Sequence, residues 1–591
     1  MLSNEVLRRQ KVTRRTFVLA GFKIGMLSLL LGRMFYMQLL KSRDYKILSD
    51  KNRINLSLIT PSRGLILDRN RRKVAENRRG FFLKIKNKRA KSTNKSIEHL
   101  SKLLNLTDPE KRQIHQNLRQ GSKTGPITIL KNISWEKVAK VEENLDDLPH
   151  FFIEQGDLRH YNFGYSFAHV TGYLGRSGDD DTSNSGALPI EFMIGKTGIE
   201  KTYNKTMQGT FGLRKSEVDA KGMLVRHLET ISPENGSDLI LNVDSEVQEY
   251  AYSILPEEGA SVIVMDINDG SVVTCCSRKS YDPNQFAEGI ASEHWKKLIN
   301  DPFKPLNNKI ISGLYAPGST FKLFTILSAL EHEVPKNTKF FCGGFIDLGK
   351  SRAHCWKHDG HGLIDMQESL KFSCNCYMYN VAKIVGIDKI LEVAARFGYG
   401  TKTGIDLNGE AKGFVPDQSW KLRNLRLNWS AGDYFNISIG QGPLLSTPIQ
   451  QVVVAAAIAN GGRLLTPRVN KEIGVNYKDI TIKKDHRDFL CNSMYRTVNE
   501  AGGAAYGSRS SVLLLAGKTG TSQVIRKKSV NDDLSLKSIA REKRNHALFS
   551  GFFPFNDPRF AIFIIVDHGG AGARNAAPIA KKLAEYIHER L

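Results

Sequence analysis

The stretch YAPGSTFKLFTILSAL, residues 315–330, places Ser319 and Lys322 three residues apart at the start of an almost wholly apolar run. Pro317 and Gly318 do not fit the interior of a helix, so the sequence predicts a helix that begins near Ser319, with the hydroxyl at its positive end. Lys322 would lie on the same face of that helix. A lysine amine acts as a base near neutral pH only when its surroundings lower its pKa, and the apolar neighbours here would do so.

This spacing recurs in the chain, because Ser92 with Lys95 and Ser134 with Lys137 share it. The alternative interpretation of each pair is a serine that caps a helix, followed by a lysine whose ammonium group reaches water. The spacing alone therefore does not identify a catalytic pair.

Two further segments favour a catalytic site around Ser319. FSCNCYMYNVAKIV, residues 372–385, places Ser373 and Asn375 at the front of another apolar helix. VLLLAGKTGTSQV, residues 512–524, places a Lys-Thr-Gly-Thr sequence at the end of a strand-like run; its residues are Lys518, Thr519, Gly520 and Thr521. Ser-x-x-Lys, Ser-Asp-Asn and Lys-Thr-Gly form the signature set of penicillin-binding proteins and serine β-lactamases.

Two details qualify this match. Cys374 stands where the middle motif often has Asp, and Lys-Thr-Gly also occurs at Lys196 and Lys402. Only the copy at Lys518 follows both serine motifs and a strand pattern. The order and local context of the three motifs therefore favour the copy at Lys518.

The chain resembles the class B penicillin-binding proteins well beyond these motifs. RGLILDRNRRKVAENR, residues 63–78, and GKTGIEKTYNKTMQGTFG, residues 195–212, are similar to two signatures of their N-terminal domain, although Arg71 stands where Gly is usual. CWKHDGHG, residues 355–362, resembles the elongation-type subfamily, penicillin-binding protein 2. GQGPLLSTPIQ, residues 440–450, is similar to a further element of the transpeptidase domain.

The resemblance, together with the pattern of polar and apolar segments along the chain, predicts an α+β fold in four parts. These are a cytoplasmic tail at residues 1–15, a transmembrane signal anchor at 16–40, an elongated mixed pedestal (dimerisation-like) domain at 44–235, and a transpeptidase domain at 236–591. The length of 591 residues supports several domains, because single cores stop growing beyond about 250–300 residues. In the last part we expect a helical subdomain and an antiparallel sheet flanked by helices, one of them buried, with a hairpin at INDG, residues 267–270.

The segment TFVLAGFKIGMLSLLLGRMFYMQLL, residues 16–40, is long enough to cross a bilayer, which needs about 20 residues. It has no small-x-small cleavage site, so we expect an uncleaved anchor. TRRTFV at residues 13–18 also resembles a twin-arginine export signal, which is the alternative. Lys41 and the basic residues after it weaken the positive-inside signal, so the expected location, inner membrane with a periplasmic catalytic domain, rests partly on the resemblance.

The resemblance implies a peptidoglycan D,D-transpeptidase of cell elongation and rod-shape maintenance, which cross-links stem peptides ending in D-Ala-D-Ala and is acylated by β-lactams. It assigns catalysis to Ser319 as nucleophile, Lys322 as base, Ser373 as proton relay, Asn375 as orienting group and Lys518 as a positive charge. It assigns substrate binding to Thr519, Gly520 and Thr521, and the oxyanion to the backbone N–H groups of Ser319 and Thr521. No cofactor is required for this chemistry.

Other functions remain as alternatives: a D-Ala-D-Ala carboxypeptidase, a membrane-anchored β-lactam sensor, or an inactive scaffold. A β-lactamase is disfavoured because no Glu-Pro-x-Leu-Asn element follows Ser373, and a fused glycosyltransferase because the N-terminal region resembles a pedestal. The resemblance therefore implies a separate, polytopic membrane glycosyltransferase and elongation-complex scaffold proteins as partners. The net charge of +25 is spread along the chain without a recognition module, so no nucleic-acid partner is expected.

Cysteine and histidine gather between residues 342 and 376. The simplest interpretation in an oxidising compartment is a disulfide between Cys342 and Cys355, or buried thiols. Cys342, Cys355, His361 and Cys374 also form a Cys₃His set suited to a structural, tetrahedral Zn²⁺. The loop resembles one that carries zinc in some elongation-type relatives, so a structural zinc site is the favoured hypothesis.

Overall fold

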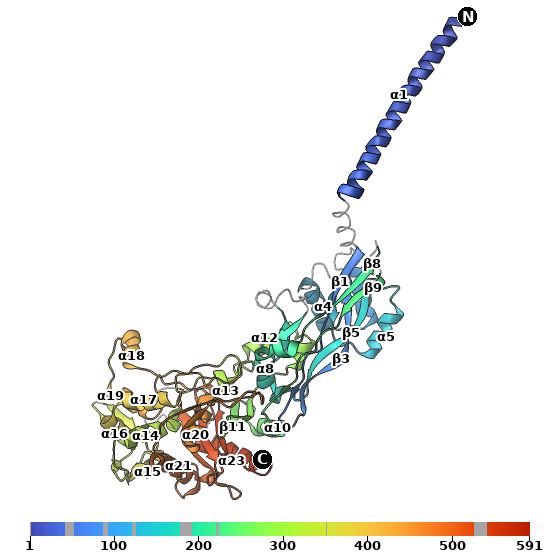
Figure 1. Cartoon of the computed structure of the whole chain (residues 1–591). Helices are drawn as coiled ribbons and strands as arrows, with labels where there is room; N and C mark the ends of the chain where they lie inside the picture. The colour runs from blue at the N-terminus through green and yellow to red at the C-terminus, as the bar shows by residue number, and fades with distance from the viewer. Residues whose placement is uncertain are drawn as a thin grey trace. The chain divides into compact units, whose positions relative to one another are not determined.

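A computed structural model describes residues 2–41, 53–86, 93–120, 126–177, 192–219, 224–349, 351–524 and 540–591 (Figure 1). The chain divides into two compact units, residues 1–62 with 209–236 and residues 63–208 with 237–591. The predicted start of the pedestal at residue 44 lies outside the described residues. The predicted boundary between residues 235 and 236 stays a prediction.

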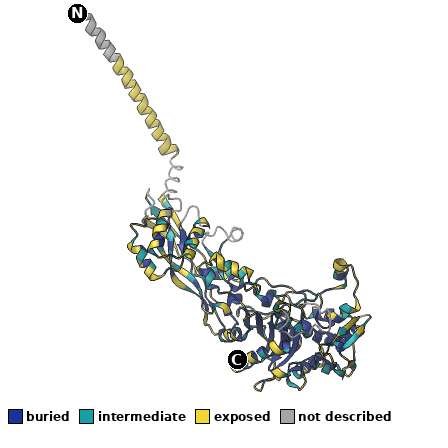
Figure 2. Cartoon of the chain, turned by 180° about the vertical axis from the view of Figure 1, so that it is seen from behind, coloured by how far each residue is buried: buried dark blue, intermediate teal, exposed yellow. Residues whose placement is uncertain are grey.

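The first unit contains helix α1, Leu2–Phe35, which continues as a π-helical turn, Tyr36–Leu40. Its stretch Arg14–Leu40 is the one described helix that is both long and apolar enough to cross a membrane. Its described side chains are exposed, as Figure 2 shows in yellow. The unit also contains an antiparallel sheet of strands β1, β8 and β9, which are Ile54–Ile59, Gly212–Val218 and Leu224–Ile231. This single apolar helix indicates a single-pass membrane anchor.

The second unit begins with a five-stranded sheet that carries the N-terminal signatures. Its strands are β2 Ile66–Leu67, β3 Lys73–Ile85, β4 Ile127–Leu130, β5 Phe151–Tyr161 and β10 Leu239–Ile240. Helices α3 Thr93–Leu103, α4 Asp108–Gln120 and α5 Trp135–Glu143 pack on it around a local apolar core. The long β3–β5 pair extends from this core to a second core, which its residues Val74, Ala75 and Tyr161 share with the C-terminal part of the chain.

A buried ion cluster joins the two N-terminal signatures. Glu200, on helix α8 (Gly198–Thr202), accepts hydrogen bonds from Arg63 at 2.6 Å and from Arg159 at 2.8 Å. Burial alone would raise the pKa of Glu200, but the two guanidinium groups outweigh it and lower that pKa. The carboxylate therefore stays charged and ties the segment before β2 to β5 and α8.

The C-terminal domain is built on a five-stranded antiparallel sheet in the order β12-β11-β21-β20-β19. Its strands are β11 Ala260–Asp266, β12 Val272–Arg278, β19 Ala516–Ser522, β20 His546–Phe553 and β21 Phe560–Val566. The hairpin predicted at residues 267–270 is confirmed, because β11 pairs antiparallel with β12 on either side of it. Strand β19, which carries the Lys-Thr-Gly motif, is an edge strand.

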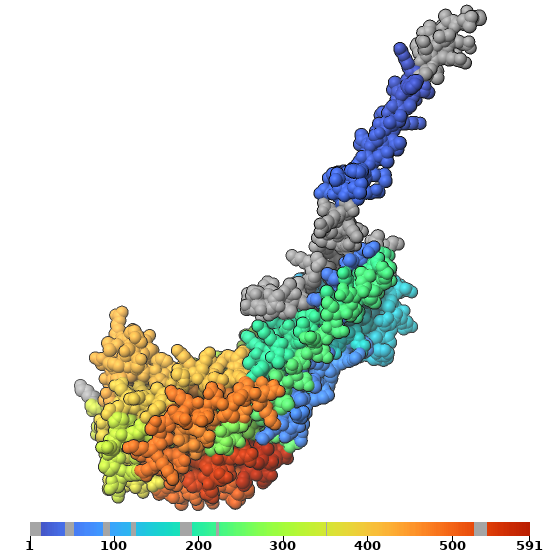
Figure 3. Space-filling view, in the orientation of Figure 1, coloured from blue at the N-terminus to red at the C-terminus, as the bar shows by residue number. Residues whose placement is uncertain are grey.

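Alternate residues of this sheet enter two different cores. Ile263 faces helix α20, Pro448–Ala459, whose twelve residues are all buried, so the predicted buried helix is confirmed. Val262 and Val264 face helices α10, Ser245–Ile254, and α23, Ala577–His588. Segments remote in sequence therefore pack together, as the interleaved orange, red and green surfaces of this domain show (Figure 3).

A helical subdomain packs beside α20. It contains α14 Lys322–Glu331, α15 Met366–Lys371, α16 Asn375–Val385, α17 Ile387–Arg396, α18 Gln418–Leu425, α19 Ala431–Ser438 and α21 Lys484–Asn499. Two small two-stranded sheets precede α15: β13 Phe340–Cys342 with β16 Gly362–Ile364, and between them in the chain the hairpin of β14 Phe345–Leu348 with β15 Ser351–His354.

The remaining elements are short connectors. They are α6 Ala168–Thr171, β6 Leu174–Arg176, β7 Met193–Gly195, α9 Asn204–Gln208, α11 Asn284–Glu288, α12 Ser292–Asn300, α13 Lys309–Ser312, β17 Arg463–Leu465, β18 Tyr477–Asp479 and α22 Gly572–Asn575, with short 3₁₀ turns at Gly164–Ser166, Tyr506–Ser508 and Arg541–Lys543.

Candidate active site

A helical run begins beside Ser319 as predicted, and its first turn, Gly318–Phe321, is a 3₁₀ turn that carries Ser319. The α-helix α14 begins three residues later, at Lys322. Gly318 has a φ of +57°, a left-handed conformation that glycine adopts without strain, and it stands at the start of this helical run. Ser319 is half-buried, whereas Lys322 has no exposed surface.

The amine of Lys322 is held by the middle motif. Its Nζ donates to the carbonyl oxygen of Ser373 at 2.7 Å and to Oδ1 of Asn375 at 2.7 Å, and lies 3.3 Å from Oγ of Ser373. Ser373 has φ +56°, a left-handed conformation that is uncommon for serine. This conformation places both its carbonyl and its hydroxyl beside the amine, immediately before α16 begins at Asn375.

Burial lowers the pKa of Lys322 to about 8, although the negative charge of the nearby cysteines raises that pKa in part. Burial also lowers the pKa of Lys518, and the charge of Lys322 lowers it further. Two ammonium groups in one water-poor site repel each other, so the site favours a neutral amine on one of them. A neutral amine beside a serine hydroxyl is what general-base chemistry requires.

Strand β19 brings the third motif against the serine turn. A Cβ on Gly318 would lie 2.5 Å from the carbonyl oxygen of Thr521, so these two backbones are in close contact. A Cβ on Gly520 would lie 3.2 Å from the carbonyl oxygen of Pro317. Lys518 is fully buried and its Nζ lies 3.4 Å from the carbonyl oxygen of Thr519. Small residues on both segments therefore allow the strand edge and the Ser319 turn to meet.

Other copies of the motifs have different surroundings. Ser134 caps helix α5 through the N–H of Lys137, whose amine pairs with Glu110 at 2.8 Å. Lys402 is exposed in a loop. Ser92 lies outside the described residues. The capping alternative thus holds for the pair at Ser134.

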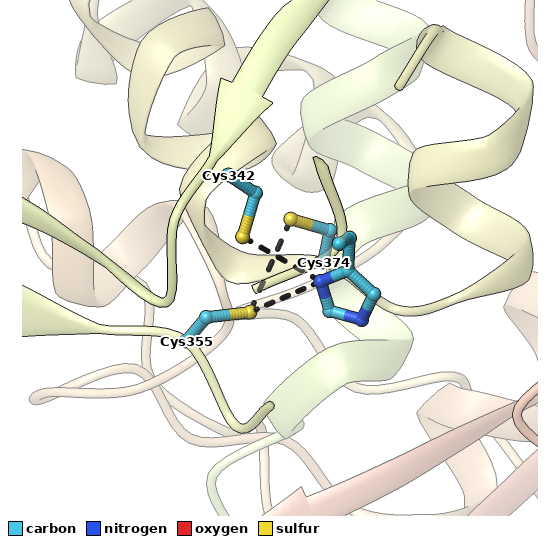
Figure 4. A group of neighbouring side chains, drawn as sticks. Cys342, Cys355 and Cys374 are labelled. Carbon is cyan, nitrogen blue, oxygen red and sulfur yellow. Dashed lines mark hydrogen bonds between the residues drawn. The ribbon is translucent and has the colours of Figure 1, made fainter. Parts of the chain in front are cut away.

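The four residues of the Cys₃His set come together beside this site. The Sγ atoms of Cys342 and Cys355 lie 3.5 Å and 3.6 Å from Nδ1 of His361, and Cys355 Sγ lies 4.0 Å from Cys374 Sγ. Figure 4 shows the three cysteine side chains pointing toward one another. All seven cysteines of the chain are described, and none forms a disulfide. The disulfide between Cys342 and Cys355 is therefore not present in this structure.

The geometry and charge of this cluster fit a metal ion. A tetrahedral Zn²⁺ with Zn–S of about 2.3 Å and Zn–N of about 2.0–2.1 Å separates its ligands by about 3.5–3.8 Å. The four ligand atoms lie within 4.8 Å of one another. The hydrogen bond between Cys342 and Cys374 lowers the pKa of Cys342 and raises that of Cys374, so in this pair it favours the thiolate at Cys342. The cluster is compatible with a structural metal.

The sequence did not single out Trp356, which also supports the middle motif. Its indole N–H lies 3.0 Å from the carbonyl oxygen of Ser373, the oxygen that also accepts from Lys322. The backbone N–H of Asn375 points at Sγ of Cys355, at 3.4 Å, and its Nδ2 donates to the carbonyl oxygen of His354. Residues 340–376, here called the cysteine loop, therefore hold Ser373 and Asn375 in contact with the buried amine of Lys322.

Comparisons with known proteins agree with this geometry. A family profile of the penicillin-binding protein transpeptidase domain matches residues 260–585, and one of the penicillin-binding protein dimerisation domain matches residues 58–241. Peptidoglycan D,D-transpeptidase MrdA of Haemophilus influenzae is 31% identical over an alignment 618 residues long, gaps included. The alignment covers 100% of this chain and 94% of the relative.

Solved structures give the same result. The complex between penicillin-binding protein PBP2 and MreC from Helicobacter pylori matches with a TM-score of 0.80 and 29% identity, over 91% of this chain and 99% of that chain. A peptidoglycan synthase complex that coordinates polymerization and crosslinking matches with a TM-score of 0.70 and 26% identity, over 96% and 97% of the two chains. The chain therefore belongs to the elongation-type class B penicillin-binding proteins, the peptidoglycan D,D-transpeptidases.

Proposed function

We propose that this transpeptidase works through an acyl-enzyme on Ser319, with Lys322 as the general base. The observation that carries the proposal is the buried amine of Lys322, which hydrogen-bonds Ser373 and Asn375 while the turn that bears Ser319 contacts Thr521. These contacts gather all three motifs at one place, although they are separated by up to 200 residues along the chain.

The reaction follows from these positions. Lys322 takes the proton of Ser319, and Oγ attacks the carbonyl carbon of the penultimate D-Ala of a stem peptide. The backbone N–H groups of Ser319 and Thr521 bind the oxyanion, and Ser373 passes a proton to the departing nitrogen, so that the terminal D-Ala leaves. An amine of a neighbouring stem peptide then attacks the ester, forms the cross-link and returns the proton to Ser319.

The remaining residues bind the donor peptide. Lys518 contributes positive charge, and the hydroxyls of Thr519 and Thr521 bind the terminal carboxylate. Gly520 lets the substrate lie close to the free edge of β19. A β-lactam enters the same site and stays on Ser319 as a stable ester.

The proposed setting is the inner membrane, with α1 as a single span and the catalytic domain in the periplasm, where the substrate is. The relative from Helicobacter pylori is solved with MreC, and another structural relative belongs to a peptidoglycan synthase complex. We propose that this chain likewise works with an elongation scaffold protein and with a membrane glycosyltransferase that supplies glycan strands.

We further propose that Cys342, Cys355, His361 and Cys374 hold a structural Zn²⁺. With four protein ligands the ion has no open position, so it would contribute order and no Lewis-acid chemistry. Its role would be to fix the loop that carries Ser373 and Asn375 relative to Lys322. The catalytic steps themselves require no cofactor.

Labelling of the membrane-embedded protein with a fluorescent penicillin tests the nucleophile. We expect one adduct per chain, mapped by peptide mass spectrometry to the peptide that contains Ser319, and no adduct on Ser319→Ala. Ser134→Ala is the matched control, because Ser134 has the same Ser-x-x-Lys spacing and caps a helix; it should label like wild type. A covalent adduct on folded Ser319→Ala protein would disprove the assignment.

A further inference from the structure

We infer that Gln441 is a positioning residue for the oxyanion site, and that its side-chain amide sets the distance between the Ser319 turn and the free edge of β19. The inference rests on the proposed Ser319 chemistry. Gln441 lies in the loop between α19 and α20, and its side chain is buried. Its motif, GQGPLLSTPIQ, is visible in the sequence, but no catalytic role follows from the sequence alone.

The amide of Gln441 bridges two residues at the end of β19. Its Nε2 donates to the carbonyl oxygen of Thr521 at 2.9 Å, and its Oε1 accepts from the N–H of Gln523 at 3.3 Å. This donor and acceptor match what a neighbouring strand would offer, so the side chain caps the free edge of β19 in place of a strand. The open part of the edge therefore ends at Thr521.

This cap acts on the group that binds the oxyanion. In an antiparallel strand the N–H and the C=O of one residue point to the same side. Since the C=O of Thr521 points to Gln441, its N–H also points to the free edge, toward the Ser319 turn. Holding the carbonyl therefore fixes the direction of the N–H that would bind the oxyanion.

The residue before Gln441 holds the other half of the site. The carbonyl oxygen of Gly440 accepts from the N–H of Gly318 at 2.8 Å, directly before Ser319. A Cβ on Gly440 would lie 2.2 Å from the carbonyl oxygen of Gly318 and 2.6 Å from Cβ of Phe321. Two consecutive residues, Gly440 and Gln441, thus hold the Ser319 turn and Thr521. The N–H groups of Ser319 and Thr521 are placed by one loop.

Gln441 should therefore influence the rate of acylation and not the initial, non-covalent binding of the substrate or β-lactam. The two N–H groups must lie about 2.7–3.1 Å from the oxyanion, and a misplacement of about 1 Å costs roughly 100-fold. Non-covalent recognition of a β-lactam uses additional groups, such as the hydroxyls of Thr519 and Thr521. A change at Gln441 should therefore lower the acylation rate constant more than it raises the dissociation constant of the initial complex.

Gln441→Glu gives the sharpest test, because its effect depends on a proton. The carboxylate accepts from Gln523 but repels the carbonyl oxygen of Thr521, whereas the protonated acid donates to that oxygen and restores the bridge. We expect the acylation rate of the variant, divided by that of wild type, to be about 0.1 or lower near pH 8 and to rise toward one as the pH falls to the ordinary glutamate pKa of about 4.3 and below. Gln441→Met, which keeps the volume without the amide, should show the same loss without recovery at low pH.

Gln450→Glu is the matched control. Gln450 is buried on α20, and its Nε2 donates to the carbonyl oxygens of Thr401 at 2.6 Å and Lys412 at 2.9 Å, away from β19. It should lower thermal stability without a pH-dependent change in relative acylation. The full-length proteins are compared by rapid-quench penicillin labelling, with circular dichroism to confirm folding.

Two outcomes overturn the inference: a Gln441→Glu rate within about twofold of wild type near pH 8, or the same pH dependence in Gln450→Glu. Failure of the wild-type protein to label at Ser319 would instead refute the proposed nucleophile, so the two failures are distinguishable.

Discussion

Lys322 shows how burial of one residue prepares the reaction. Its amine has no exposed surface, and burial lowers its pKa to about 8. In the proposed mechanism the neutral form is the base, so the fraction of competent enzyme rises as pH increases through that pKa and falls below it. The hydrogen bonds to Ser373 and Asn375 keep the amine in place in either state.

We therefore expect the acylation rate constant of the wild-type protein to increase about tenfold for each pH unit below about pH 8 and to level off above it. Lys322→Arg keeps the charge but cannot supply a neutral base, and it should lose about 10²–10⁴ in rate. Stopped-flow labelling across pH measures both. A flat wild-type profile through this range would contradict Lys322 as the base.

The sequence predicts the residues of the three motifs but not the groups that support them. Ser319 and Lys322 are close in the chain, so their pairing follows from helical spacing. Trp356 and Gln441 act through hydrogen bonds to Ser373 and Thr521, 17 and 80 residues away. Such contacts depend on tertiary packing, which periodicity does not reveal.

At the scale of elements, the helices and strands that the sequence predicts correctly are those with a clear pattern of apolar residues or a clear turn motif. The β11–β12 hairpin follows from an Asn-Asp-Gly turn between two apolar runs, and α20 follows from twelve residues without a single charge. The helix predicted to begin near Ser319 is present, but its first turn, Gly318–Phe321, is a 3₁₀ turn and the α-helix follows from Lys322. Gly318 has a left-handed φ and lies against Thr521 and Gly440, which are far away in sequence, so periodicity does not reveal this geometry.

Disordering the cysteine loop should lower activity much more than it lowers stability. It spans the two small two-stranded sheets and the N-terminus of α16, and its cysteines contribute a small part of a core that extends from Ile66 to Ile565. Removing a bound metal should therefore lower the acylation rate about 10-fold to 100-fold, because Ser373 and Asn375 lose their support. The melting temperature should fall by only a few degrees, because the large core remains.

Metal analysis of protein purified without added zinc and without chelator checks the site, together with thiol counting under denaturing conditions. His361→Ala provides a second route to the same loss, with His358→Ala as the control from the same loop. Substoichiometric zinc combined with a Cys342–Cys355 disulfide in the mass spectrum would rule the metal site out.

At the scale of the whole molecule, Arg14–Leu40 is the stretch of the described chain that is long and apolar enough to anchor the protein in a membrane. Leu29 and Leu30 are exposed near the middle of the span, as lipid-facing residues would be. Arginine at the centre of a spanning helix costs about 2.5–3.5 kcal/mol per residue. The double variant Leu29→Arg, Leu30→Arg should therefore insert poorly and lose penicillin labelling in intact cells, although its catalytic domain is unchanged.

The wild-type protein should remain in the membrane fraction with its N-terminus uncleaved, and its C-terminal domain should be digested by protease added to spheroplasts. Arginine at Leu56 and Leu58, which are exposed on β1 outside the span, is the control and should leave localisation unchanged. A mature N-terminus beyond Leu40 would replace the anchor with a cleaved signal. A C-terminal domain protected from protease would place the catalytic site in the cytoplasm, where a cross-linking enzyme of the cell wall has no substrate.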